Sequence, residues 1–244
     1  MSGHSKWATT KHRKAAQDAK RSALFSKLSR NITVAAKEGG DPNPDNNASL
    51  AAAIEKAKGY SLPKDKIKTA IDKAFGTGKD AANYETLTYE GYGPSGVAVI
   101  VEALTDNRNR TAADVRHAFD KFGGNLGTTG CVSFMFNKKG VIAIEREGLD
   151  EDTVMMDALE AGAADFEADG TVLEITTDPD AFNDVIAALE AKGYTFVSAD
   201  ISLVPQTYVK LTSEEDIKNM EKLLDMLEDN EDVQNTYHNW ETED

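Results

Sequence analysis

The sequence predicts a multi-domain protein of α and α+β parts: an N-terminal three-helix bundle followed by two ferredoxin-like α+β domains, one inserted in the other. Two observations lead to this prediction. The spacing of apolar residues changes from helical to strand type near residue 84, and the charge changes sign close to the same place. Residues 1-79 carry 16 Lys and Arg against 7 Asp and Glu, a net charge of +9, so the whole-chain value of −15 leaves −24 for residues 80-244.

Three short amphipathic helices are predicted in the basic part. Apolar residues recur at helical spacing over residues 15–37, and Gly39-Gly40 ends this first helix. A second helix is predicted over residues 48–58, and Pro63 begins the third. Three short amphipathic helices of this kind make a small bundle.

The acidic part opens with a predicted β-hairpin. Residues 84–90 and 97–104 alternate in strand fashion, and the glycine-rich segment 91–96 joins them as a turn. A helix is predicted over 111–122, and a further strand over 132–136.

Residues 140–204 then read strand, helix, two strands, helix and strand. This βαββαβ order is that of the ferredoxin-like fold. A strand, a helix and a last strand follow between residues 208 and 240. Joining 97–136 to 207–240 gives a second βαββαβ unit that carries the first as an insertion.

These elements divide the chain into three predicted domains. They are residues 1-80 (basic N-terminal arm and helical bundle), 81-137 with 206-244 (discontinuous α+β domain), and 138-205 (inserted ferredoxin-like domain).

Composition indicates a cytoplasmic protein. No apolar run approaches the roughly 18 to 20 residues needed to span a bilayer, and the N-terminus is polar and basic. The single cysteine, Cys131, excludes an internal disulfide and fits a reducing compartment.

No arrangement of residues indicates catalysis. The segment 91–96 matches G-x-G-x-x-G, but a strand follows it where a dinucleotide site needs a helix. Cys131 has no histidine or cation beside it in sequence, and the four histidines lack ligand spacing. We therefore expect no enzymatic activity, no metal, no cofactor and no small-molecule substrate.

The N-terminal arm is the main candidate for nucleic-acid binding. Its cations can pair with phosphates, its tryptophan can stack on an unpaired base, and its histidine can donate hydrogen bonds. The alternative is a tail that only increases solubility. The predicted contacts are Lys6, Trp7, Lys11, His12, Arg13, Lys14, Lys20 and Arg21.

A strand-to-helix loop offers a secondary contact through Arg108, Arg110 and Arg116. These cations either contact a ligand or pair with nearby aspartates, and the sequence leaves both alternatives open. The loop 123–130, rich in glycine, likewise either exposes backbone amides to an anion or only connects a helix to a strand.

Several blocks along the chain resemble the YebC/PmpR family. They are Met1-Ser2-Gly3-His4-Ser5-Lys6-Trp7, Lys11-His12-Arg13-Lys14-Ala15-Ala16-Gln17-Asp18-Ala19-Lys20-Arg21, Gly39-Gly40-Asp41-Pro42, Leu62-Pro63-Lys64-Asp65, Tyr89-Glu90-Gly91-Tyr92-Gly93-Pro94, Thr105-Asp106-Asn107-Arg108-Asn109-Arg110-Thr111, Gly123-Gly124-Asn125-Leu126-Gly127, Leu227-Glu228-Asp229 and Asp232-Val233-Gln234. They span nearly the full length in order.

The resemblance implies three domains and a cytoplasmic, non-enzymatic regulator of gene expression. Family members are described as probable transcriptional regulatory proteins that bind DNA. Related proteins, including a mitochondrial translational activator of cytochrome c oxidase, act on ribosomes and ease stalling. Two functions follow as alternatives: a translation factor that binds rRNA or tRNA, with basic ribosomal proteins as further partners, or a DNA-binding regulator acting at promoters. The charge of −24 over residues 80-244 favours the first, because it limits the duplex surface that the protein could cover.

Overall fold

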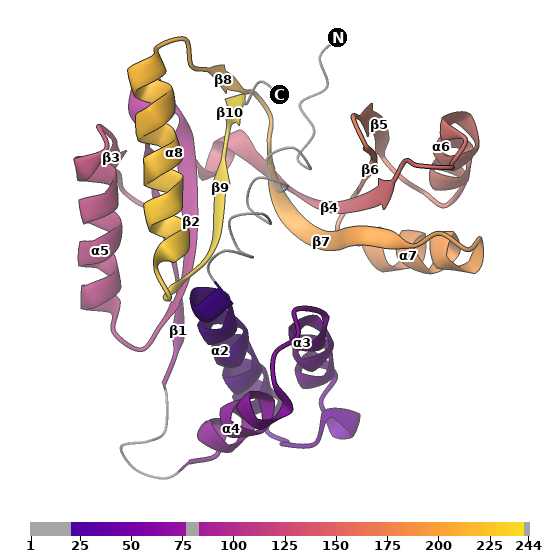
Figure 1. The fold of residues 1–244 in the computed structure, drawn as a ribbon, viewed down its shortest axis with the longest axis horizontal. Coiled ribbons are helices and arrows are strands. Elements are labelled where there is room, and N and C mark those ends of the chain that lie inside the picture. The colour runs from indigo at the N-terminus through magenta and orange to yellow at the C-terminus, as the bar shows by residue number, and fades with distance from the viewer. Residues whose placement is uncertain (1–20, 77–82, 242–244) are drawn as a thin grey trace. The chain divides into compact units, whose positions relative to one another are not determined.

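The computed structural model describes residues 21–76 and 83–241 (Figure 1). Its contacts divide these residues into two compact units. One unit holds residues 21–76, 83–132 and 211–238, and the other holds residues 133–210 and 239–241. Multiple helices and antiparallel sheets make this a multi-domain α+β fold, as predicted. In the described ranges, no helix combines the length and the apolar character needed to cross a membrane.

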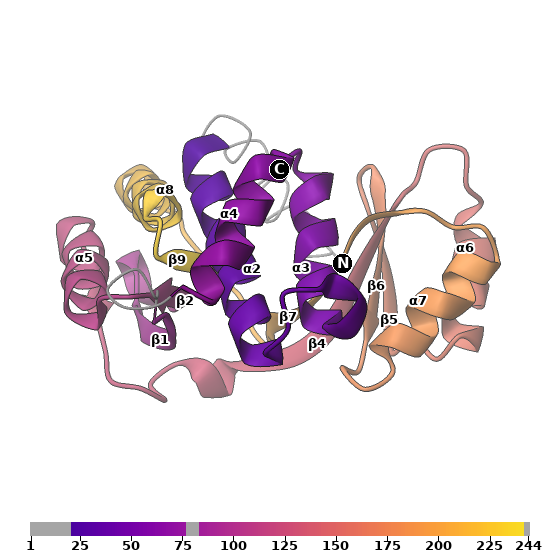
Figure 2. The ribbon, with the colours of Figure 1, turned by 90° about the horizontal axis from the view of Figure 1, so that it is seen from below.

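Three helices form the bundle of the first unit: α2 (Arg21–Gly39), α3 (Ala48–Gly59) and α4 (Lys64–Ala74). Figure 2 shows α3 and α4 lying along α2. Their apolar faces meet in one core, as the helical spacing predicts. Its most deeply buried members are Leu28, Ile32, Ala36, Leu50, Ala57 and Ala70.

Asn47 connects two helices of the bundle. Its side-chain oxygen accepts a hydrogen bond from the Leu50 amide at 3.0 Å and caps α3. Its side-chain nitrogen donates to the Ala35 carbonyl of α2, also at 3.0 Å. Gly39 allows this approach, because a Cβ atom there would collide with the Asn47 amide.

A four-stranded antiparallel sheet completes the first unit, in the order β3-β1-β2-β9. The predicted hairpin is present, with register from Glu85↔Thr105 to Tyr92↔Ala98. Helices α5 and α8 supply the buried residues Val115, Phe119, Leu223 and Leu227. The elements are β1 (Glu85–Tyr92), β2 (Ala98–Thr105), α5 (Arg108–Lys121), β3 (Asn125–Leu126), α8 (Glu214–Asp229) and β9 (Val233–His238).

The prediction of a strand at 132–136 was wrong. Ser133–Met135 forms a short 3-10 helix, and Phe136 begins a strand of the other unit's sheet. In the sheet of the first unit, the strand next to β2 on the side away from β9 is β1, which precedes β2 in the chain. The physical reason is local: the hairpin pairs β1 and β2 across a short turn, so that β3 finds its partner at the free edge of β1.

The strand predicted at 208–211 also lies outside that sheet. The two residues of β8 (Val209–Lys210) pair in parallel with β10 (Trp240–Glu241) in a separate two-stranded sheet of the second unit.

The second unit contains the predicted βαββαβ sequence. Its strand order, β5-β6-β4-β7, is antiparallel throughout and is that of the ferredoxin-like fold. Two helices cover one face of this sheet (Figure 2), and the core between the layers includes Ile142, Leu173, Val154 and Leu189. The elements are β4 (Phe136–Glu145), α6 (Glu151–Glu160), β5 (Asp165–Asp169), β6 (Val172–Thr177), α7 (Phe182–Ala191) and β7 (Phe196–Pro205).

We predict that Asn47→Ala destabilises the bundle by about 1 to 3 kcal/mol, because it removes a helix cap and leaves the buried Ala35 carbonyl without this donor. Hydrogen exchange of the α2 and α3 amides in the full chain measures the loss of protection. Asn43→Ala is the matched control, since exposed Asn43 caps only the short 3-10 helix Pro44–Asn46. Equal protection in the two variants would contradict the role of Asn47.

Candidate nucleic-acid interface

Most of the predicted arm contacts lie outside the described residues. These are Lys6, Trp7, Lys11, His12, Arg13, Lys14 and Lys20. Arg21 is the first residue of α2, and its side chain is not described. The role of the arm therefore stays a prediction.

The bundle itself carries exposed lysines on α4. This helix buries Ile67 and Ala70 on one side. Lys64, Lys68 and Lys73 are exposed, and none of them forms an ion pair with another residue of the described ranges. The helix also carries exposed Asp65 and Asp72, so its four lysines (64, 66, 68 and 73) against two aspartates leave a net charge of +2, which favours phosphate.

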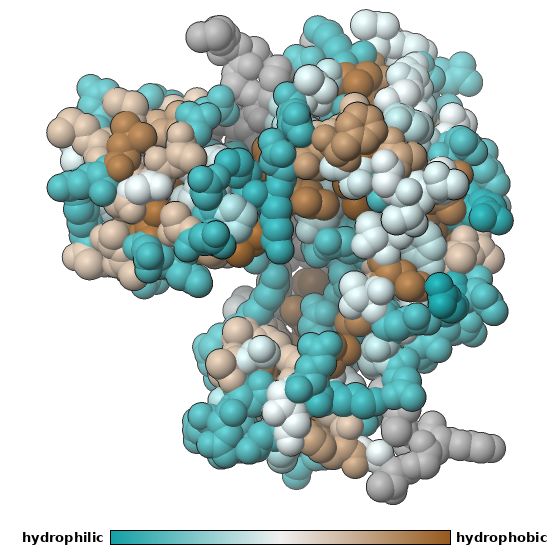
Figure 3. Space-filling model, turned by 180° about the vertical axis from the view of Figure 1, so that it is seen from behind, coloured by the Kyte–Doolittle hydropathy of each residue, from teal (hydrophilic) through white to brown (hydrophobic). Residues whose placement is uncertain are grey.

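Other bundle cations are already in contact with neighbours. Lys58 pairs with Glu55 at 2.6 Å, and the Lys66 ammonium lies 5.5 Å from the centre of the Phe25 ring. Hydrophilic residues dominate much of the bundle's surface in the lower part of Figure 3. Sequence reasoning included these lysines in the net charge of the bundle and assigned no contact to them. The signal was available, because lysines alternate with the buried positions of the third predicted helix.

A buried carboxylate organises the charges where α2 meets the start of α5 and the start of β9. The side chain of Asp232 is only 4% exposed. It accepts hydrogen bonds from Arg110 Nη2 at 2.8 Å and from Thr111 Oγ1 at 2.7 Å. Arg30 of α2 donates to its other oxygen. One carboxylate therefore connects α2, the start of α5 and the start of β9.

The ionised form of Asp232 is favoured. Burial alone would raise the pKa of Asp232, but the hydrogen bonds from Arg110 and Thr111 and the charge of Arg30 outweigh it, so that this pKa lies below its usual range. The same contact, together with Asp106, raises the pKa of Arg110. Both groups stay charged at neutral pH.

These contacts determine which arginines of the predicted secondary nucleic-acid contact are exposed to a ligand. Arg110 pairs internally with Asp232 and Asp106, which is one of the two alternatives that the sequence left open. Arg108 is 67% exposed and lies 3.9 Å from Glu85, too far for a strong pair. Arg116 is exposed on α5 and pairs with no acidic residue of the described ranges.

Two cations of α2 also contact the end of α8 and the turn that follows it. Lys27 Nζ donates to the Glu228 carbonyl at 2.6 Å, and Arg30 Nη1 donates to the Glu231 carbonyl at 2.7 Å. The last carbonyls of a helix carry partial negative charge, which favours cations there. These two side chains therefore fix α2 against the α8–β9 turn.

The glycine-rich loop holds an internal anion. The carboxylate of Glu90, a residue that is 4% exposed, accepts hydrogen bonds from the amides of Gly130 and Val132 at 2.8 and 2.9 Å. An external phosphate would have to displace this carboxylate. Burial, with the charge of Glu90, raises the pKa of the neighbouring Cys131 thiol, which keeps it protonated and poorly nucleophilic.

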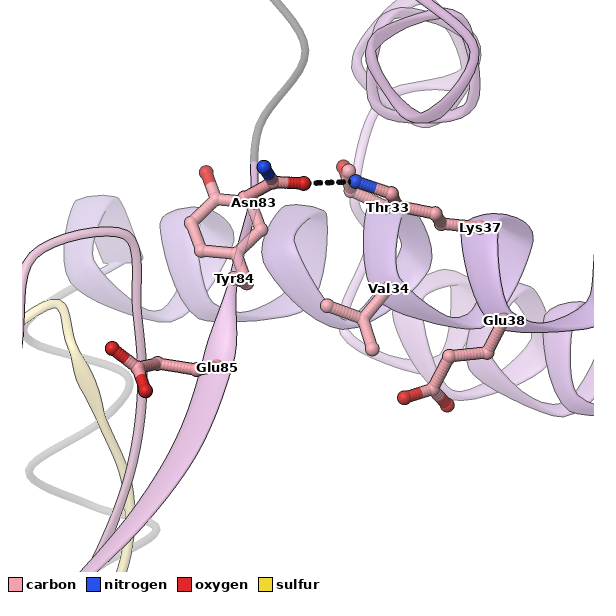
Figure 4. A pocket seen from close by; sticks show the side chains of 7 residues that line it. All are labelled: Thr33, Val34, Lys37, Glu38, Asn83, Tyr84 and Glu85. Carbon is pink, nitrogen blue, oxygen red and sulfur yellow. Dashed lines mark hydrogen bonds between the residues drawn. The ribbon is translucent and has the colours of Figure 1, made fainter.

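A cavity of about 560 Å³ lies between α2 and the residues leading into β1 (Figure 4). Lys37 donates across it to the side-chain oxygen of Asn83. The hydroxyl of Thr33 faces the bundle, where it donates to backbone carbonyls including that of Ala70. Among the described residues, no group of His, Cys, Asp and Glu is placed to hold a metal ion.

Two family models match the sequence. Residues 5–77 match the N-terminal domain of the TACO1/YebC proteins, and residues 84–240 match their second and third domains. The chain belongs to the TACO1/YebC family. The resemblance inferred from the sequence blocks is thereby confirmed.

TACO1/YebC relatives match over the whole chain. A protein of Finegoldia magna is 55% identical over 243 residues, and one of Caldicellulosiruptor saccharolyticus is 56% identical over 244 residues. Both alignments cover 100% of each chain, and both relatives are named probable transcriptional regulatory protein. A solved structure, the conserved hypothetical protein Aq1575 of Aquifex aeolicus, is similar with a TM-score of 0.80 and 43% identity, covering 92% of this chain and 91% of that chain.

We predict that Asp232→Asn lowers the free energy of unfolding of this TACO1/YebC chain by about 2 to 3 kcal/mol at neutral pH, since the amide replaces a buried, charge-assisted acceptor. The folded-state pKa is depressed, so the carboxylate stabilises the fold above an unfolded pKa of about 3.9, and this stabilisation is lost as the pH falls through the folded pKa. The difference between the two proteins should therefore shrink in acid.

Urea unfolding at neutral pH and near pH 3 measures both effects. Glu231→Gln is the control, because its carboxylate is 55% exposed and lies 3.4 Å from Arg30; we expect a change within about 0.5 kcal/mol. An Asp232→Asn protein as stable as the parent at neutral pH would contradict the prediction.

Proposed function

We propose that this chain is a non-enzymatic, nucleic-acid-binding regulator of gene expression that acts in the cytoplasm as an RNA- and ribosome-associated translation factor and eases stalling. The observation that supports it most directly is the net positive charge of α4, where Lys64, Lys68 and Lys73 are exposed and without ionic partners in the described ranges. The names of the relatives support the broader statement, a regulatory protein.

The distribution of charge favours folded or single-stranded RNA over a long duplex. Residues 80-244 carry a net charge of −24, which repels phosphate. Arg110 pairs internally with Asp232, so it adds little to a basic surface there. The attractive surface is limited to the bundle and the arm, and Trp7 in that arm suits stacking on unpaired bases. Basic ribosomal proteins are further proposed partners of the acidic part.

A DNA-binding regulator acting at promoters is the alternative function. The printed name of the relatives, probable transcriptional regulatory protein, favours it. A basic helical bundle is also compatible with docking on the phosphates of duplex DNA.

Crosslinking the protein to nucleic acid in cells and sequencing the attached fragments distinguishes the two functions. We expect rRNA or tRNA. Discrete promoter fragments would overturn the translation-factor proposal and support the alternative. A variant lacking residues 2–21 should lose the crosslinks while its far-UV circular dichroism still indicates a folded protein, because the arm supplies the predicted contacts.

We predict that Lys64, Lys68 and Lys73 together contribute to the salt dependence of RNA binding. If about four to six arm cations contact phosphate, the slope of log affinity against log salt is near −3 to −5 from the arm alone. The triple variant Lys64→Gln, Lys68→Gln, Lys73→Gln should reduce the total slope by about 2, because each lysine that neutralises a phosphate of a single strand contributes about 0.7 to the slope.

Fluorescence anisotropy with an RNA hairpin, measured across a salt titration, gives the slope. The matched control is the triple variant Lys121→Gln, Lys218→Gln, Lys222→Gln, which makes the same change of charge with three exposed lysines of the acidic part. An equal change of slope in both variants would assign the effect to net charge rather than to the α4 surface.

A further inference from the structure

Helix α6 of the inserted domain carries apolar side chains that nothing in the described ranges buries. Met156 is 67% exposed and Leu159 is 51% exposed. Leu149, just before the helix, is 38% exposed. These side chains lie on one of the most acidic parts of the chain. We call Met156 and Leu159 the α6 patch.

The α6 patch lies away from the contacts that hold the helix in place. Val154 and Ala158 face the sheet and are buried. Asp157 and Glu160 both bind Lys192, at the end of α7. Met156 and Leu159 are three residues apart and so share a face of the helix. Hydrophobic residues are visible on the lobe that holds α6 and α7, at the left of Figure 3.

The charge around the α6 patch is strongly negative. Residues 138–205 contain 16 Asp and Glu against 4 Lys and Arg. Three of those four cations pair within the domain: Lys192 with Asp157, Arg146 with Glu151, and Lys139 with Asp178. Asp152 is exposed one turn before Met156, at the border of the patch. The α6 patch is therefore an apolar surface surrounded by acidic residues.

We propose that the α6 patch is a docking site for a Lys/Arg-rich amphipathic segment of another protein. Apolar side chains of that segment would cover Met156 and Leu159, and its cations would face the carboxylates around them. The unbranched methionine side chain adapts to different partners. The proposal rests on the part of the proposed function that gives the acidic domains basic protein partners, and it does not depend on which nucleic acid the bundle binds.

Charge excludes the other occupants of such a surface. Nucleic acid and anionic membranes would meet a repulsive field over residues 138–205. A second copy of the chain, joined through the same patch, would place two acidic surfaces face to face, since a two-fold interface uses the same residues on both sides.

The test uses the full chain and a labelled helical peptide with leucine on one face and lysine on the other. Fluorescence anisotropy should detect binding, and the double variant Met156→Ser, Leu159→Ser should weaken it about tenfold or more, which corresponds to about 1.4 kcal/mol. Both positions are exposed, so the variants should keep the circular dichroism of the parent. Ile201→Ser is the control for Leu159→Ser, because Ile201 is 41% exposed on β7 of the same domain.

Two further peptides separate the contributions. The first has glutamate in place of lysine and should not bind. The second has the same leucines and lysines in an order that gives no apolar face. It should bind the parent as weakly as it binds the double variant. Equal affinity of the lysine peptide for parent and double variant would overturn the proposal. So would self-association, or binding to phosphatidylserine vesicles, that the double variant abolishes.

Discussion

The buried carboxylate of Asp232 is the contact on which the arrangement of the first unit depends. Removing a charged group from water is costly unless every oxygen finds a donor. Arg110 and Thr111 from α5 and Arg30 from α2 supply those donors. Because the donors belong to different elements, satisfying one carboxylate fixes the bundle helix, the start of α5 and the start of β9 together.

The cations of the chain fall into two groups, those that stabilise the fold and those that are exposed to solvent. Those next to the acidic sheet, Arg30 and Arg110, neutralise buried charge and are committed to the fold. Those on α4, such as Lys64 and Lys68, face solvent without a partner in the described ranges. Attraction for an external polyanion therefore concentrates on the bundle, although basic residues occur along the whole chain. The inserted domain has the opposite character, with carboxylates around an apolar centre.

Local patterns predicted much of this structure. Helical spacing indicated the bundle, alternation indicated the β1–β2 hairpin, and the order of elements indicated the inserted βαββαβ domain. Long-range pairing was harder to predict. Arg110 and Asp232 are 122 residues apart, and Glu90 lies 40 residues from the Gly130 amide that it binds. A sequence presents such residues as separate charges, so the choice between internal pairing and ligand binding needed coordinates. The strand predicted at residues 132–136 was wrong for a related reason. The residues that complete the first sheet, β3, pair with a free edge of β1, and such pairing leaves no periodic signal in the sequence.

The ends of the inserted domain have a consequence for how such a chain can change. Phe136 pairs with Pro205, so the polypeptide enters and leaves the four-stranded sheet of the inserted domain at neighbouring points of two antiparallel strands. Those two positions are also where a simple hairpin would start and finish. A short turn in place of everything between them could join the two positions in the same antiparallel pairing. The insertion thus has the geometry of a detachable module, one that a lineage could gain, enlarge or exchange without rebuilding the parent sheet.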